Sequence, residues 1–179
     1  MNQSEGISVV KILVIGVPPS VGTQFINSIN MLNPSSIHQK YGAILPPIFE
    51  SLSIGFGELK IDQHTMLHFY DIPNPEVISP FWDILAQNCI GDILVMHDYS
   101  DECISAALKI INFYLLKLRM VSTIVINSSS PIGTFPLQTI RKKLKLPKDV
   151  QMFECDIARP ASVKVVLLGL LEHIYHLSK

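Results

Sequence analysis

The sequence has few charged residues and no excess of charge of one sign. Charged residues make up 16% of the 179 residues, and 14 basic side chains nearly balance 15 acidic ones, for a formal net charge of −1. Domains that bind nucleic acid usually concentrate lysine and arginine on one surface, and segments that bind anionic membranes carry a polybasic run. The sequence has neither feature, so we expect no nucleic-acid partner.

Long hydrophobic runs and paired cysteines are also scarce. The longest apolar stretches, such as Val165–Leu171, fall well short of the roughly 20 residues that cross a bilayer. Residues 1–6 are polar and contain no lysine or arginine, which gives no indication of a secretory signal. Cys89, Cys103 and Cys155 are odd in number and form no Cys-x-x-Cys pair. We therefore expect a cytoplasmic protein with no membrane span, disulfide or metal centre.

Apolar residues, by contrast, are abundant. They make up 48% of the chain, and the mean hydropathy is +0.35, which excludes disorder and supplies a core. The length suits one domain, and no linker divides it, so we predict a single domain over residues 1–179 with residues 1–7 as a disordered tail. The high hydropathy also leaves apolar surface for a partner.

Short apolar runs alternate with longer amphipathic segments along the chain. Alternation of this kind indicates a mostly parallel sheet with right-handed crossovers and helices on both faces. The polar turn at residues 62–64 lies between two apolar runs and predicts one antiparallel hairpin. We predict strands over 9–15, 55–61, 65–71, 92–96, 121–126 and 150–155, and helices over 23–32, 81–87, 101–118, 137–144 and 161–177.

The segment after the first strand is the first place to look for a ligand. Doubly wound sheets bind ligands at the carboxyl ends of their strands, and Gly16–Thr23 stands where a phosphate-binding loop, Gly-x-x-x-x-Gly-Lys-Ser/Thr, would follow the strand. An ordinary strand-to-helix turn, with Thr23 capping the helix, fits the same residues. No lysine or arginine occurs between Ile12 and Gln39, so no basic side chain close in the sequence is available to neutralise a phosphate charge.

Several further segments match one family. Lys11–Gly16 fits its opening strand, Asp71–Pro75 stands at its Asp-x-x-Gly-Gln motif, and Val125–Ser130 at its Asn-Lys-x-Asp motif. Phe81–Leu85 stands where a bacterial branch has Trp-Asp-Glu-Leu. From Lys11 to about residue 173, the chain resembles the Ras-like small GTPases, specifically the bacterial branch of gliding-motility polarity switches and conservon GTPases.

The resemblance implies a Ras-like P-loop NTPase (G-domain) fold, with a mostly parallel six-stranded sheet and one antiparallel edge hairpin. It also implies a GTP or GDP site, with Mg²⁺ held by Thr23 and by Ser51 at the magnesium-binding threonine. The positions equivalent to the nucleotide site are Gly16, Ser20, Gly22, Thr23, Ser51, Asp71, Asn127, Ser130 and Asp156.

The chain departs from the family at the positions that bind phosphate, recognise guanine and orient the attacking water. Pro18 and Pro19 lack the N–H groups that build a phosphate cradle. Ser130 replaces the aspartate that pairs with guanine N–H groups, and Pro75 replaces the glutamine that orients the attacking water. We therefore predict a pseudo-GTPase with no cofactor; the alternative is an atypical small GTPase that binds GTP or GDP weakly and hydrolyses GTP slowly.

The resemblance also implies a protein partner. In the bacterial branch the usual partner resembles a roadblock/LC7 dimer, within polarity, surface-motility or pilus systems, and we expect it to contact residues 34–57 and 72–85. Buried packing is the alternative for Trp82. The side chains expected to face the partner are Phe56, Pro75, Phe81 and Trp82.

Other polar residues have simpler structural interpretations. Asn127 is expected to brace the phosphate-binding loop by a hydrogen bond, and Asp156 to cap or orient a loop. Asp71 is either a polar strand end or a residual magnesium contact. His97-Asp98 and Asp101-Glu102 are expected to mark a helix start, with acids at its positive end.

Overall fold

The sheet has the predicted architecture. The structure, a computed structural model, describes residues 7–32, 54–72, 87–112, 121–128 and 136–177. Six strands of this part form one sheet in the order β2-β3-β1-β4-β5-β6, and all neighbours are parallel except β2 and β3. The strands are β1 (Ser8–Val17), β2 (Gly55–Lys60), β3 (Thr65–Ile72), β4 (Cys89–Met96), β5 (Val121–Asn127) and β6 (Gln151–Cys155).

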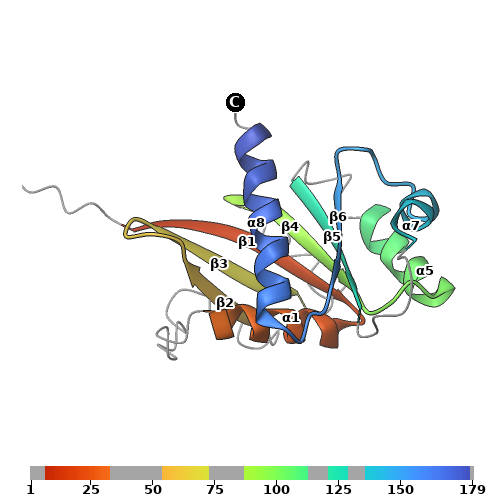
Figure 1. Ribbon diagram of the computed structural model, residues 1–179, viewed down its shortest axis with the longest axis horizontal. Coiled ribbons are helices and arrows are strands. Elements are labelled where there is room, and N and C mark those ends of the chain that lie inside the picture. Colours follow the sequence, from red (N-terminus) through yellow and green to blue (C-terminus); the bar gives the residue numbers. More distant parts are fainter. Residues whose placement is uncertain (1–6, 33–53, 73–86, 113–120, 129–135, 178–179) are drawn as a thin grey trace, which may run out of the picture.

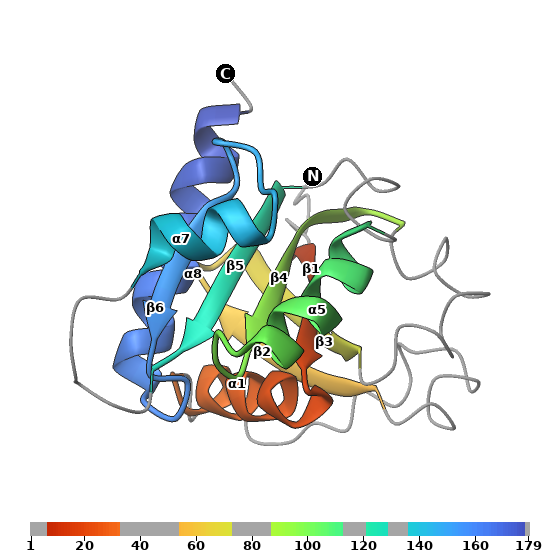
Figure 2. The same cartoon turned by 90° about the vertical axis from the view of Figure 1, so that its right-hand side faces the viewer.

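Helices cover both faces of the sheet (Figures 1 and 2). Helix α1 (Pro19–Leu32) and helix α8 (Pro160–Leu177) pack on one face, and α5 (Asp101–Ile110) and α7 (Leu137–Lys143) on the other. The helix predicted over 81–87 and the loop over 34–50 lie outside the described residues, as does the end of the helix predicted over 101–118. No helix in the described ranges is both long and apolar enough to cross a membrane.

The core forms two apolar layers because strand residues alternate between the faces. In β1, Ile12 and Val14 pack towards α1 and α8, while Leu13 and Ile15 pack towards α5 and α7. Each of the four is at most 2% exposed. A strand buried on both faces must be apolar throughout, which explains the continuous run that predicts β1. Burial of each such side chain contributes roughly 1.5–3 kcal/mol.

Strand order brings three strand ends together beside α1. Central β1 pairs with β3 on one side and β4 on the other, with Val14 opposite Asp71 and Val17 opposite Met96. The backbone N–H of His97 donates to the carbonyl oxygen of Val17 at 2.8 Å. The segments after β1 and β4 and the end of β3 therefore meet at one edge of the sheet, where this architecture places ligands.

Candidate functional site

The connection between β1 and α1 is a single residue, Pro18. Strand β1 ends at Val17 and α1 begins at Pro19, with a cis peptide bond between Val17 and Pro18. Proline suits the first helical position because an N–H there has no helical acceptor and its φ is already helical. Ser20 is exposed in the first turn. The interpretation in which Thr23 caps α1 was wrong, because the helix begins at Pro19.

Backbone atoms of the first turn of α1 closely surround Gly16. A Cβ added to Gly16 would lie 2.7 Å from the carbonyl oxygen of Pro19 and 2.8 Å from that of Pro18, and it would collide with the backbone N of Gly22. The start of α1 therefore packs directly on the end of β1. Two of the groups in this contact are carbonyl oxygens, whereas an anion requires N–H groups directed towards it.

The first turn of α1 also offers few free donors. A helix start normally leaves four N–H groups without helical acceptors, and these can bind an anion. Here Pro19 has no N–H, and the N–H of Val21 donates to the carbonyl oxygen of Pro18 at 3.1 Å. The described residues at this helix end therefore do not fit a nucleoside di- or triphosphate.

A buried carboxylate lies beside this turn. Oγ1 of Thr23 donates to Oδ2 of Asp71 at 2.7 Å, and Asp71 is 2% exposed. A Cβ on Gly22 would collide with Oδ1 of Asp71, and a Cβ on Gly55 would lie 2.9 Å from Cβ of Asp71. The absence of side chains at these two glycines, in α1 and β2, lets the two elements close around the carboxyl group.

The surroundings of Asp71 disfavour its charged form. Its Oδ1 has no hydrogen-bond partner among the described residues. Burial raises the pKa of Asp71 above the usual value of an aspartate, and the hydrogen bond from Thr23 opposes part of that rise. A buried carboxylate with one donor and no cation is better satisfied when it is protonated.

The residues present do not fit a magnesium ion well. Mg²⁺ takes six oxygen ligands in near-octahedral geometry. The described chain offers two candidate ligands: the hydroxyl oxygen of Thr23, which keeps its lone pairs while its proton is donated to Asp71, and Oδ1 of Asp71, which packs against the backbone of Gly22. Ser51 lies outside the described residues. Within the described ranges, no group of three or more His, Cys, Asp and Glu side chains is placed to hold a metal ion.

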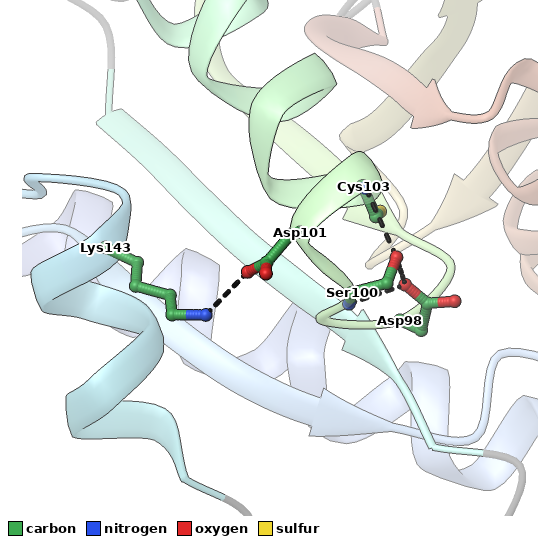
Figure 3. Close-up of polar contacts among 5 residues, drawn as sticks. All are labelled: Asp98, Ser100, Asp101, Cys103 and Lys143. Carbon is green, nitrogen blue, oxygen red and sulfur yellow. Dashed lines mark hydrogen bonds and ion pairs between the residues drawn. The ribbon is translucent and has the colours of Figure 1, made fainter.

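The segment after β4 is a helix start, as predicted (Figure 3). Oδ1 of Asp98 accepts hydrogen bonds from both N and Oγ of Ser100, at 2.9 and 2.7 Å, and these bonds lower the pKa of Asp98. Oγ of Ser100 in turn accepts from N of Cys103, which makes Ser100 the N-cap of α5. In the first turn, Asp101 forms a 2.7 Å ion pair with Lys143 of α7. These contacts account for the acidic side chains without catalysis or a metal.

Cys89, Cys103 and Cys155 are free cysteines in the described chain. Sγ of Cys103 donates to the carbonyl oxygen of Val17 at 3.5 Å and so joins α5 to the end of β1. Cys155 is buried at the end of β6, as predicted, and burial raises the pKa of both thiols. Raised thiol pKa values make these side chains poor nucleophiles at neutral pH.

The positions that the resemblance assigns to guanine binding lie at the ends of β5 and β6 and in the loop after β6. Oδ1 of Asn127 accepts from N of Ile157 at 3.2 Å. The prediction that Asn127 braces residues 16–23 is therefore corrected: its described bond goes to the loop after β6. Asp156 orients that loop as expected, because its Oδ1 accepts from N of Ala158 and its N donates to Oγ of Ser162. Ser130 lies outside the described residues.

Two polar residues of α1 were missed in the sequence. Oγ of Ser28, which is buried, donates to the carbonyl oxygen of Ile157 at 2.6 Å. The side chain of Asn30 donates to the carbonyl oxygen of Phe56 and accepts from N of Glu58, both at 3.3 Å, so it covers part of the outer edge of β2. A polar residue on the apolar side of the helix is the signal that would have identified Ser28, whereas Asn30 is exposed and has no such signal.

Of the side chains expected to face a partner, only Phe56 lies in the described part of the chain. It is half-buried, and its ring meets the rings of His68 and Tyr70 edge-on at 5.0 and 5.4 Å. Its ring is thus packed partly into the core layer on the α5 side. Pro75, Phe81 and Trp82 lie outside the described residues.

Comparisons with known proteins identify the fold but no family. No family model and no curated protein matches the sequence. Among the solved structures that match is the Arl6 BBS3 small GTPase from Trypanosoma brucei with the bound nucleotide analogue GppNp. It aligns with a TM-score of 0.68 and 13% sequence identity over 94% of this chain and 99% of that chain. The chain therefore has the fold of a Ras-like small GTPase, as the sequence predicts.

Proposed function

We propose that this chain is a pseudo-GTPase that acts as a protein-interaction and regulatory module. The observation that carries the proposal is the one-residue turn at Pro18, which sets the start of α1 against Gly16. In a phosphate-binding loop, several residues separate strand and helix and direct their N–H groups at the phosphates. In this chain the corresponding residues belong to the helix itself.

Charge supports the same proposal. The carbonyl oxygens of Pro18 and Pro19 lie close to Gly16 at this turn, and carbonyl oxygens do not attract the negative charge of a polyphosphate. A polyphosphate at this turn would also approach the carboxyl group of Asp71, while no lysine or arginine lies between Ile12 and Gln39 in the sequence. Anions bound without charge-assisted hydrogen bonds lose the strongest contacts available to them.

One contact favours the second candidate, an atypical small GTPase with weak GTP or GDP binding and slow hydrolysis. The hydrogen bond between Thr23 and Asp71 joins two positions that the resemblance associates with magnesium. A hydroxyl group that donates its proton keeps its lone pairs, so Thr23 would be able to contact Mg²⁺ while it stays bonded to Asp71.

The partner proposed is a roadblock/LC7-type dimer within a bacterial polarity, motility or pilus system. This part rests on the resemblance, and the surface proposed comprises residues 34–57 and 72–85. In the described part, Asn30 holds the backbone of β2 at Phe56 and Glu58, which fixes the strand beside that surface. A strand that is already ordered loses less conformational entropy when a partner binds.

Thermal unfolding with and without nucleotide tests the proposal. A ligand present at about 100 times its dissociation constant stabilises the folded state by roughly 2.7 kcal/mol. We expect no shift of Tm with millimolar GTP or GDP and Mg²⁺, whereas a co-expressed roadblock-type dimer should copurify. A nucleotide-induced rise of several degrees that Thr23→Val abolishes and Thr23→Ser keeps would establish the atypical GTPase instead.

A further inference from the structure

Helix α8 presents an exposed apolar stripe on the side that faces away from the sheet. Val165, Leu168 and Tyr175 are 60%, 51% and 60% exposed. Their spacing of three and seven residues places them along one side of the helix. The opposite side is buried in the core through Val163, Val166, Leu167 and Leu170. Exposed apolar side chains gathered on one helix face indicate an interaction surface rather than scattered surface residues.

The stripe is self-complementary about its centre, Leu168. Lys164 precedes Leu168 by four residues and Glu172 follows it by four, while Ala161 and Tyr175 lie seven residues to either side. All five are on the exposed side of α8. A small residue and a large one, and a cation and an anion, are thus placed at equal distances from the same point.

We propose that α8 forms a homodimer interface in which two copies of this helix pack antiparallel about a two-fold axis at Leu168. In this arrangement the Leu168 side chains meet at the axis, and Lys164 of each copy lies level with Glu172 of the other. Ala161 likewise lies level with the bulky Tyr175 of the second copy. A two-fold interface must be self-complementary in this way, because one patch contacts itself.

The two charged residues are available for this pairing. Neither Lys164 nor Glu172 has a hydrogen bond or ion pair among the described residues, although both are exposed. They are also the only lysine and the only glutamate in the α8 sequence, which contains no arginine or aspartate. A helix that binds an anionic membrane usually carries several basic residues on its polar face. The balanced pair therefore favours a second copy over a lipid surface.

The length of the exposed stripe on α8 limits the area that the proposed dimer can bury, and hence its expected affinity. Figure 1 shows α8 lying along the outside of the sheet, with its last turns extending beyond the strands. The stripe from Ala161 to Tyr175 is about 21 Å long at 1.5 Å per residue. Two helices in contact over that length bury on the order of 1,000 Å², at the low end for a specific interface. We therefore expect a dimer that dissociates in the micromolar range.

Sedimentation of the full chain over a range of concentrations tests the proposal. The wild-type chain should pass from monomer to dimer, and Leu168→Glu should remain monomeric because it places two like charges at the axis. Lys164→Glu should weaken the dimer about tenfold, since it turns two attractive contacts into repulsive ones. The double variant Lys164→Glu/Glu172→Lys restores both pairs and should recover the wild-type dissociation constant.

Lys148→Glu is the matched control, because it makes the same charge change at an exposed lysine outside α8. It should leave the dissociation constant unchanged. A chain that stays monomeric throughout, a Leu168→Glu variant that still dimerises, or a double variant as weak as Lys164→Glu would each overturn the proposal. Binding of the monomer to anionic vesicles that Leu168→Glu abolishes would assign the stripe to a membrane and overturn it equally.

Discussion

Oγ1 of Thr23 donates a 2.7 Å hydrogen bond to Oδ2 of Asp71, which joins helix α1 to the end of β3. The proton of this hydroxyl, at a position that the resemblance to small GTPases associates with magnesium, is therefore held by Asp71, while the oxygen keeps its lone pairs. The other carboxyl oxygen of Asp71 lies against Gly22, with no hydrogen-bond partner in the part of the chain that the structure describes. The contact holds together the edge of the sheet at which this fold binds its ligands.

Removal of the hydroxyl from Thr23 should destabilise the fold. Thr23→Val leaves both oxygens of the buried carboxyl group without a donor, and we expect a loss of about 1–3 kcal/mol in the free energy of unfolding. Thr23→Ser keeps the donor and should lose less than half as much. Urea unfolding of the three proteins measures the difference; equal losses in both variants would contradict a role for the hydroxyl.

Replacement of Gly22 should be unfavourable even though it lies in a helix. Gly22→Ala gains about 1 kcal/mol of helix propensity at an ordinary interior site. Here the new methyl group collides with Oδ1 of Asp71, so we expect net destabilisation. In an Asp71→Ala background this collision is absent, and only the contact with the backbone N of Gly16 at 3.1 Å remains, so Gly22→Ala should cost less stability there than in wild type. A double-mutant cycle with no coupling would refute the close packing of these residues.

Lowering the pH should increase the stability of the wild-type chain relative to that of an Asp71→Asn variant. The pKa of Asp71 is raised by burial, so the folded state binds this proton more tightly than the unfolded state does. The carboxyl group therefore lowers stability at neutral pH, and that loss is recovered as the pH falls through the folded pKa towards 3.8. Between pH 7.5 and 4.5, the stability of wild type should increase relative to that of the variant in denaturant titrations, and an unchanged difference would contradict the raised pKa.

His68 should give the opposite pH dependence. Burial, and secondarily the charge of Lys11, lower the pKa of His68 below 6.5. As the pH falls, the unfolded chain takes up this proton before the folded chain does. The contribution of neutral His68 to the free energy of unfolding is therefore fully present above pH 6.5 and decreases below that value. A His68→Phe variant should lose less stability than wild type between pH 7.5 and 5.5. An identical loss in both proteins would show that His68 is not the titrating group.

Local patterns predicted the frame of the fold, and long-range contacts determined the details of the site. The apolar run of β1 and the polar turn between β2 and β3 carry their own signals, and both were confirmed. The predicted start of α1 at residue 23 was wrong, because the helix begins at Pro19. The segment resembles a phosphate-binding loop, but proline favours the first position of a helix.

Pairings between distant residues left no trace in the local sequence. Thr23 meets Asp71 across 48 positions, and Ser28 meets Ile157 across 129. Each depends on the order of the strands, which places the end of β3 and the loop after β6 beside α1. Hydrophobic periodicity identifies strands and helices, but it does not specify which polar groups the assembled sheet brings together.

The nucleotide content of the purified protein is the direct test of the proposal that this chain does not bind guanine nucleotides tightly. Chromatography of the denatured, deproteinised sample, with the ratio of absorbance at about 260 to 280 nm in the native protein, detects guanine nucleotides retained through purification. Tight nucleotide binding gives a stoichiometric complex that survives dilution. We predict no guanine nucleotide above trace level. Recovery of GDP or GTP at close to one molecule per chain would contradict the account.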